Sequence, residues 1–219
     1  MPRSPKRSTV GENETLHPGR CLWDAASGIS LASALAPPTG CLIDTGAPGD
    51  VCASDLAVLP EADKLFASVR NATAYRLPVA RLFIGALAER IEIDQELYFR
   101  MEIALQEAIM NAVIHGNLGI GQIARDGLTE ISEIETILAE RLASPDRAVR
   151  RVRIEARWTP RDVLISICDE GAGYVPDWER HLQVGPASHG RRGLSIMHAV
   201  ARSIDVSDHG RCLTLSFAR

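Results

Sequence analysis

Three polar residues recur at four-residue intervals in the middle of the chain: Glu107, Asn111 and His115. On a helix this spacing stacks an acid, an amide and an imidazole on one face, and the residues between them are mostly apolar. The amide oxygen of Asn111 suits a hard cation such as Mg²⁺, and the carboxylate of Glu107 suits a general base. The alternative is an ordinary solvated pair of side chains on a helix that Gly116 ends.

A second segment whose residues could take part in chemistry follows the strand-like run 163–168. Asp169 opens it, and Gly171 and Gly173 come next at a spacing of two. Glycines let the backbone come close to a ligand, and an acid at a strand end can accept a hydrogen bond from the amino group of a base. The alternative is a plain glycine turn capped by Asp169.

A third segment opens an apolar helical run and contains Gly190, Arg192, Gly193 and Leu194. Free backbone N–H groups at a helix N-terminus, with glycines and arginines beside them, bind anions. The segment lacks the Lys-Ser/Thr ending of a Walker A loop, and no βαβ unit surrounds it. A loop glycine before a helix is the alternative. In this order, the three segments predict a magnesium–nucleotide pocket.

Composition excludes several other functions. The 219 residues carry a net charge of −4 and only 5% aromatic side chains, which favours neither nucleic acid nor an anionic membrane as partner. No apolar run approaches the roughly 18–20 residues of a membrane span. The cysteines are odd in number without a CxxC pair, and Cys168 and Cys212 lie in apolar strand-like runs. We therefore expect buried free thiols, no structural zinc and a cytoplasmic location.

The elements that must position these segments can be predicted from periodicity. Residues 1–70 are predicted to be a largely irregular extension with a short strand at 40–44 and a short helix at 62–69. Residues 71–219 are predicted to form the compact domain. Its predicted elements are a strand at 74–77, helices at 79–90 and 94–115, a helical insertion or lid at 118–149 with a helix at 128–142, strands at 150–158 and 163–168, a helix at 192–204, and a hairpin of 204–208 with 213–217. Antiparallel strands with grouped helices indicate an α+β, two-layer α/β sandwich.

Two runs carry a family resemblance: Glu107-x-x-x-Asn111-Ala-x-x-His115-Gly116-Asn117 and Asp169-Glu-Gly-Ala-Gly173-Tyr-Val-Pro176. Over roughly residues 71–219 the chain resembles the GHKL superfamily of ATP-binding domains, most closely the anti-sigma-factor serine/threonine kinases. The resemblance implies a Bergerat-type fold, which is a mixed, mainly antiparallel sheet with helices on one face. It also implies ATP and Mg²⁺ as cofactors.

The resemblance also assigns a role to each candidate residue. Asn111 would hold Mg²⁺ against the ATP phosphates, and Glu107 would activate a serine or threonine hydroxyl. Asp169 would read the adenine amino group. The remaining ATP-binding residues would be Gly171 and Gly173 around the base, and Gly190, Arg192, Gly193 and Leu194 over the phosphates. For His115, a cap of the helix end is the preferred interpretation, and contact with phosphate or the base-pocket rim is the alternative.

The implied function is phosphorylation of a small antagonist protein and control of a sigma factor or similar regulator, with a homodimer as a further expectation. Two alternatives use the same residues differently. A nucleotide-dependent binding switch would keep Asn111 and Asp169 but would perform little or no transfer. A structural module with an inactive pocket would have no nucleotide affinity.

Overall fold

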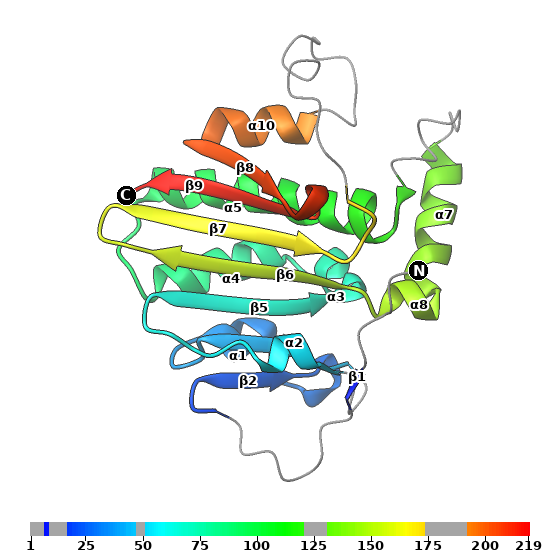
Figure 1. Cartoon of the computed structure of the whole chain (residues 1–219), viewed down its shortest axis with the longest axis horizontal. Helices are drawn as coiled ribbons and strands as arrows, with labels where there is room; N and C mark the ends of the chain where they lie inside the picture. Colours follow the sequence, from blue (N-terminus) through cyan, green and yellow to red (C-terminus); the bar gives the residue numbers. More distant parts are fainter. Residues whose placement is uncertain (1–6, 9–16, 47–50, 121–130, 174–191) are drawn as a thin grey trace.

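The computed structural model describes residues 7–8, 17–46, 51–120, 131–173 and 192–219, and within them a seven-stranded sheet dominates (Figure 1). Its strand order is β2-β3-β5-β6-β7-β9-β8. The strands are β2 (Arg20–Trp23), β3 (Cys41–Asp44), β5 (Lys64–Arg70), β6 (Arg151–Trp158), β7 (Asp162–Asp169), β8 (Ser203–Ser207) and β9 (Cys212–Ala218). A separate two-stranded sheet pairs β1 (Arg7–Ser8) with β4 (Val51–Cys52).

Helices pack mainly against one face of the sheet, and Figure 1 shows α4 and α5 behind it. The helical segments are η1 (Ala25–Ser27), α1 (Leu31–Leu35), α2 (Ala53–Leu56), α3 (Asn71–Arg76), α4 (Val79–Ala88), α5 (Gln95–Asn111), η2 (Ala112–Asn117), α7 (Ile131–Ala143), α8 (Pro145–Ala148), α10 (Arg192–Val200) and η4 (Asp208–Gly210). Strands β5 to β9 pair antiparallel, whereas β2, β3 and β5 pair parallel. The expected α+β sandwich with a mixed, mainly antiparallel sheet is confirmed.

The prediction of a largely irregular segment over residues 1–70 is wrong for residues 20–70. They form three strands of the main sheet, although only the strand at 40–44 was expected. A second small core on the sheet face away from α5 packs Phe66 against Cys41, Ile43 and Val51. Strands and helices of four or five residues are too short to show periodicity, so proline and glycine dominated the sequence pattern.

Two elements were predicted with the wrong structure. Residues 62–69 were expected to be helical, but β5 runs through them and is buried along almost its whole length. A strand buried on both faces shows no alternation of polar and apolar residues, so the pattern could not identify it. Residues 74–77 were expected to be a strand, but α3 is a helix that ends where Leu77 turns extended before Pro78.

Helix α5 confirms the prediction made for the centre of the chain. Asp94 caps it by accepting the backbone N–H of Leu97 at 2.7 Å. Its inner face carries residues that are 0–1% exposed, among them Met101, Leu105 and Ile109. Gly116 does not end the helix, because the π-helical turn η2 continues to Asn117. Single π-helical turns occur often at functional sites.

The remaining predicted elements are close to those observed. The hairpin of β6 and β7 and the final hairpin of β8 and β9 are confirmed. Helix α7 lies within the predicted helix at 128–142 except for one residue at its end, and residues 121–130 lie outside the described part of the chain. Helix α10 ends at Val200, earlier than predicted, because β8 starts at Ser203 and pairs with β9.

Cys168 and Cys212 were predicted to be free thiols, and that prediction is wrong. They form a disulfide between β7 and β9, with their Cα atoms 4.1 Å apart. The two residues face each other beside a backbone hydrogen bond from Asp169 to Arg211, at a position where antiparallel strands bring side chains closest. The pairing depends on the register of two strands that are distant in sequence. Because Cys168 and Cys212 are paired, the cysteines support a reducing compartment less than the sequence suggested.

Candidate functional site

The C-terminal part of α5 and the start of α10 meet at two of the predicted site residues. Glu107 and Asn111 are both partly buried on the last two turns of α5. A Cβ atom added to Gly193 would lie 2.6 Å from Oε2 of Glu107 and 3.6 Å from Nδ2 of Asn111. Only a glycine lets the first turn of α10 come this close to the carboxylate. The first and third sequence segments therefore adjoin in space.

Helix α10 is held in this position from its other end. Met197 is fully buried in the core, and Arg100 of α5 donates from Nε to the carbonyl oxygen of Val200 at 2.9 Å. Leu194 packs against the same core. The first turn of α10 therefore lies beside Asn111, at Gly193. Gly190 and the side chain of Arg192 lie outside the described residues.

The second segment meets η2, directly after the C-terminal end of α5. Asp169 is the last residue of β7, and a Cβ added to Gly116 would lie 2.4 Å from its Cγ atom. Oδ1 of Asp169 accepts the backbone N–H of Gly171 at 2.7 Å. Among the described residues no hydrogen bond to Oδ2 is found. The carboxylate is therefore held by its neighbours while one oxygen can accept from a ligand amino group.

The environment of Asp169 changes its acidity. Burial raises the pKa of this carboxyl to about 6, although the N–H of Gly171 and the charges of Arg211 and Arg150 oppose the rise. The residue is still mainly ionised above neutral pH, and the ionised form is the better hydrogen-bond acceptor. A buried acid with a raised pKa beside a helix end is a typical feature of a functional site.

The two glycines after Asp169 serve the protein's own backbone contacts. A Cβ at Gly171 would lie 2.1 Å from the carbonyl oxygen of Gly116. Gly173 has a φ of +83°, and a Cβ there would lie 2.3 Å from the carbonyl oxygen of His209 in η4. These contacts shape the segment around Asp169.

His115 is exposed on η2.

A comparison with known protein families gives one match. A family model for the histidine kinase-like ATPase domain matches residues 70–126, which include α3, α4, α5 and η2. Over these residues the chain is similar to the histidine kinase-like ATPase domain. This family includes the anti-sigma-factor kinases, and its domains bind ATP, typically with Mg²⁺. No curated protein matches the sequence.

The residues fit both ligands. Asp169 has an acceptor oxygen that could serve adenine, and Gly193 puts the first turn of α10, a kind of helix start that can bind phosphates, beside Glu107 and Asn111. Asn111 lies beside that helix start. Because Mg²⁺ in nucleotide sites is held mainly by phosphates and water, a single amide oxygen is an adequate protein ligand.

One residue that holds the segment of Asp169, Asn117, was not among the predicted site residues. Asn117 is fully buried at the end of η2, and its Oδ1 accepts the backbone N–H of Glu170 at 2.7 Å. Its Nδ2 donates to Asn71 at 2.8 Å and to the carbonyl oxygen of Arg151 at 2.9 Å. Asn117 therefore ties the central helix to the loop that carries Asp169. Its position next to Gly116 was the only signal in the sequence.

Three arginines of residues 141–150 bind carbonyl groups at the end of η2. Arg141 and Arg147 both donate to the carbonyl oxygen of Leu118, and Arg150 donates to that of Asn117 at 2.7 Å. Cations are favoured at a helix C-terminus, where carbonyl groups lack partners. The predicted insertion at 118–149 is thus connected to the end of η2.

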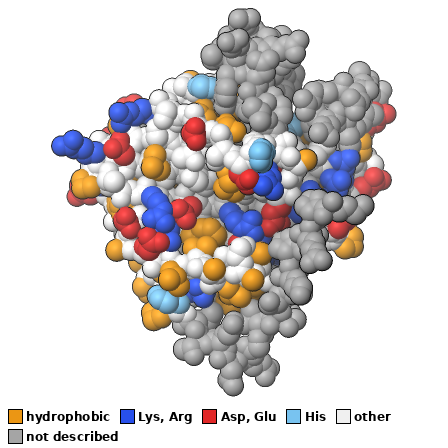
Figure 2. Space-filling model, viewed as in Figure 1, with side chains coloured by type: hydrophobic (Ala, Val, Ile, Leu, Met, Phe, Trp, Pro, Cys, Tyr) orange, Lys and Arg blue, Asp and Glu red, His pale blue; other side chains and the backbone are white. Residues whose placement is uncertain are grey.

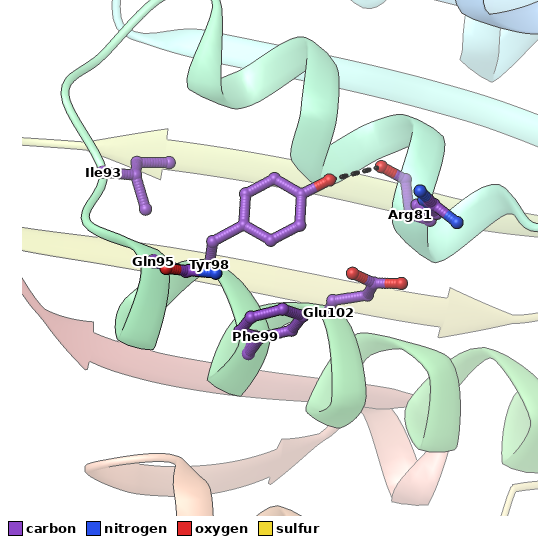
Figure 3. A pocket seen from close by; sticks show the side chains of 6 residues that line it. All are labelled: Arg81, Ile93, Gln95, Tyr98, Phe99 and Glu102. Carbon is purple, nitrogen blue, oxygen red and sulfur yellow. Dashed lines mark hydrogen bonds between the residues drawn. The ribbon is translucent and has the colours of Figure 1, made fainter.

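A hollow at the opposite end of α5 is separate from this site. It is lined by Arg81, Ile93, Gln95, Tyr98, Phe99 and Glu102. Figure 3 shows Tyr98 reaching from α5 towards α4, where its hydroxyl donates to the carbonyl oxygen of Arg81 at 3.4 Å. None of the predicted site residues lines it.

No helix in the described ranges has the length and apolar character required to cross a membrane.

Proposed function

We propose that the chain is an ATP- and Mg²⁺-dependent serine/threonine protein kinase of the anti-sigma-factor type. It phosphorylates a small antagonist protein and thereby controls a regulatory partner such as a sigma factor. The observation that carries the proposal is the assembly of Glu107, Asn111, Asp169 and Gly193 around one helix and its π-helical end. Adenine binding, phosphate binding and general-base catalysis can then act on one nucleotide.

In this proposal each group has a distinct task. Asp169 accepts a hydrogen bond from the adenine amino group, and the start of α10 binds the phosphates through its backbone N–H groups. Asn111 holds Mg²⁺, which neutralises charge on the phosphates during transfer. Glu107 accepts the proton of the serine or threonine hydroxyl that attacks the terminal phosphate. Positioning and charge neutralisation account for most of the catalysis.

A nucleotide-dependent binding switch is the competing function, and one observation favours it. Gly193 lies against the Glu107 carboxylate, on the side where a Cβ would be only 2.6 Å away. Helix α10 thus covers one side of this oxygen, and a shift of α10 would open that side to a substrate hydroxyl. In a switch, the same shift would change partner affinity without phosphoryl transfer.

The first test is calorimetric titration of the full chain with ATP, with and without Mg²⁺. Wild type is expected to bind, and Asn111→Ala is expected to lose the magnesium-dependent part of the affinity. No binding at millimolar ATP would overturn both the kinase and the switch.

The second test separates these two functions on the variant Glu107→Gln, with Glu102→Gln on the same helix as the matched control. Transfer of labelled phosphate from ATP to candidate antagonist proteins is measured. A kinase is expected to lose about 10²- to 10⁴-fold in transfer rate with Glu107→Gln while it keeps ATP affinity. Equal transfer by both variants would contradict the role of Glu107. Light scattering on the same samples tests the expected homodimer.

A further inference from the structure

The end of β7 places two neighbouring carboxylates on opposite sides of the sheet. Asp169 faces the helices, since it pairs with buried Val152 and touches Gly116. Glu170 faces the other side, where its Oε1 accepts from Arg153 at 2.8 Å and its Oε2 accepts the backbone N–H of Arg151 at 3.1 Å. Successive side chains of a strand point to opposite faces. Glu170 is therefore linked to a part of the protein that does not contact the nucleotide site directly.

That part is the N-terminal layer, the segment of residues 41–70 that extends the sheet. Its helix α2 contributes Asp55, which is completely buried. Oδ1 of Asp55 accepts from Nε of Arg153 at 2.6 Å, and Oδ2 accepts from Ser68 at 2.6 Å. Arg153 thus bridges Asp55 and Glu170. The resemblance to the kinase family did not extend to this layer.

The charges in this cluster balance. Three acids, Asp44, Asp55 and Glu170, lie among three arginines, Arg70, Arg151 and Arg153. Burial disfavours the charge of Arg153, but Asp55 and Glu170 outweigh it and raise the pKa of the guanidinium above its usual value. A low-dielectric environment makes such a network stiff when every member is paired.

We propose that Asp55 is a positioning residue for adenine recognition, acting through Arg153 and Glu170 on Asp169. The inference rests on the nucleotide binding proposed above. Glu170 lies between Asp169 and Gly171 in the chain, and it is held by Arg153, by the backbone of Arg151 and by Asn117. When the Asp55 carboxylate is removed, Arg153 loses one of its two anchors, and the Asp169 segment is held less firmly.

This coupling predicts an effect on base choice. The hydrogen bond from adenine to Asp169 depends on distance and angle, so displacement of the carboxylate weakens it. Guanine has a carbonyl oxygen where adenine has its amino group, so GTP cannot make this bond. A loss of positioning lowers affinity for ATP but leaves affinity for GTP unchanged. A general loss of folded protein lowers both affinities equally.

The experiment measures the affinities of the full chain for ATP and GTP with Mg²⁺ by calorimetry. Asp55→Asn is expected to reduce the ratio of ATP to GTP affinity by roughly five- to tenfold, within the range of coupling between contacting residues. Glu155→Gln is the matched control, because it removes a carboxylate from the Arg157 ion pair on the same sheet face and is expected to leave the ratio unchanged. Thermal unfolding confirms that each variant is folded.

Two further variants make the result decisive. In an Asp169→Asn background, Asp55→Asn is expected to have no further effect on the ratio. If Asp55→Asn does not fold, Glu170→Gln at the partly exposed end of the network takes its place with the same expected loss. An unchanged ratio in a variant that binds ATP overturns the inference alone. Absence of ATP binding by wild type overturns the proposed function and the inference with it.

Discussion

The two sides of the sheet at the end of β7 use charge in opposite ways. On the helix side, the carboxyl of Asp169 is partly buried, has no ion pair among the described residues, accepts one backbone N–H, and has its pKa raised to about 6. On the other side, Asp55 and Glu170 share the cation of Arg153, and Asp55 receives a second hydrogen bond from Ser68. The surface of this second face carries acidic and basic groups side by side (Figure 2).

The difference separates a binding role from a structural one. The paired charges of Asp55, Glu170 and Arg153 neutralise one another and stabilise the fold. The carboxylate on the helix side is held in position but not neutralised, so part of its interaction energy is available to a ligand. The same segment of four residues, 168–171, joins both environments.

The largest expected effect tests whether the charges around Asp55 stabilise the fold. Asp55→Ala removes one partner of the buried Arg151 and of the partly buried Arg153, and it is expected to lower the free energy of unfolding by about 3–5 kcal/mol. Asp169→Asn removes an unpaired buried charge and is expected to leave that free energy unchanged or raise it slightly at pH 8. Urea unfolding followed by circular dichroism measures both. Equal losses would remove the distinction between the two sides.

The next effect concerns the close packing on the helix side. Gly116→Ala places a methyl group 2.4 Å from Cγ of Asp169, so the carboxylate or the helix end must shift. ATP affinity is expected to fall about 100-fold, because displacing a binding group by about an ångström can have an effect of this size. Gly85→Ala is the control, because its Cβ would meet only the Tyr98 hydroxyl at 3.7 Å. Binding that is unaffected by Gly116→Ala would show that Asp169 does not contact the nucleotide.

A smaller effect follows from the acidity of Asp169. Because the ionised carboxylate accepts the adenine hydrogen bond, ATP affinity is expected to fall as pH decreases below about 6, by up to about tenfold per pH unit. The contribution of Asp169 to stability has the opposite sign. Its pKa in the folded protein lies above the ordinary aspartate value of 3.8, so that contribution is present at low pH and lost as pH rises through about 6.

Calorimetry between pH 5 and 8 on wild type and Asp169→Asn checks this expectation. Titration of the ATP phosphates affects both proteins alike, so the difference between their profiles reports Asp169. Parallel profiles would assign the pH dependence to another group.

The smallest expected effect lies on the exposed part of the second face. Arg157 and Lys64 donate hydrogen bonds to Glu61 and lower its pKa to about 2. The pair of Arg157 and Glu61 is solvent-exposed, and exposed ion pairs add little to stability. Glu61→Gln is expected to leave the melting temperature within experimental error at pH 7. A clear decrease would show that charge stabilises this face beyond the buried network.

Local patterns in the sequence were sufficient for much of the fold and part of the site. The four-residue spacing of Glu107 and Asn111, the cap at Asp94 and the alternation along β6 predicted the helix and hairpin that were found. Strands β2 and β5 were missed because β2 has only four residues and β5 is buried on both faces and shows no alternation. The functional roles of Glu107, Asn111 and Asp169 remain predictions.

By itself, the sequence determined which residues could do chemistry and on which helix or strand most of them lie, because periodicity and caps act over a few residues. The tertiary structure decided which of them meet. It placed Gly193 against Glu107, paired Cys168 with Cys212, and connected Asp55 through Arg153 to the segment of Asp169. These contacts depend on strand register and on packing between distant segments, which no local pattern encodes.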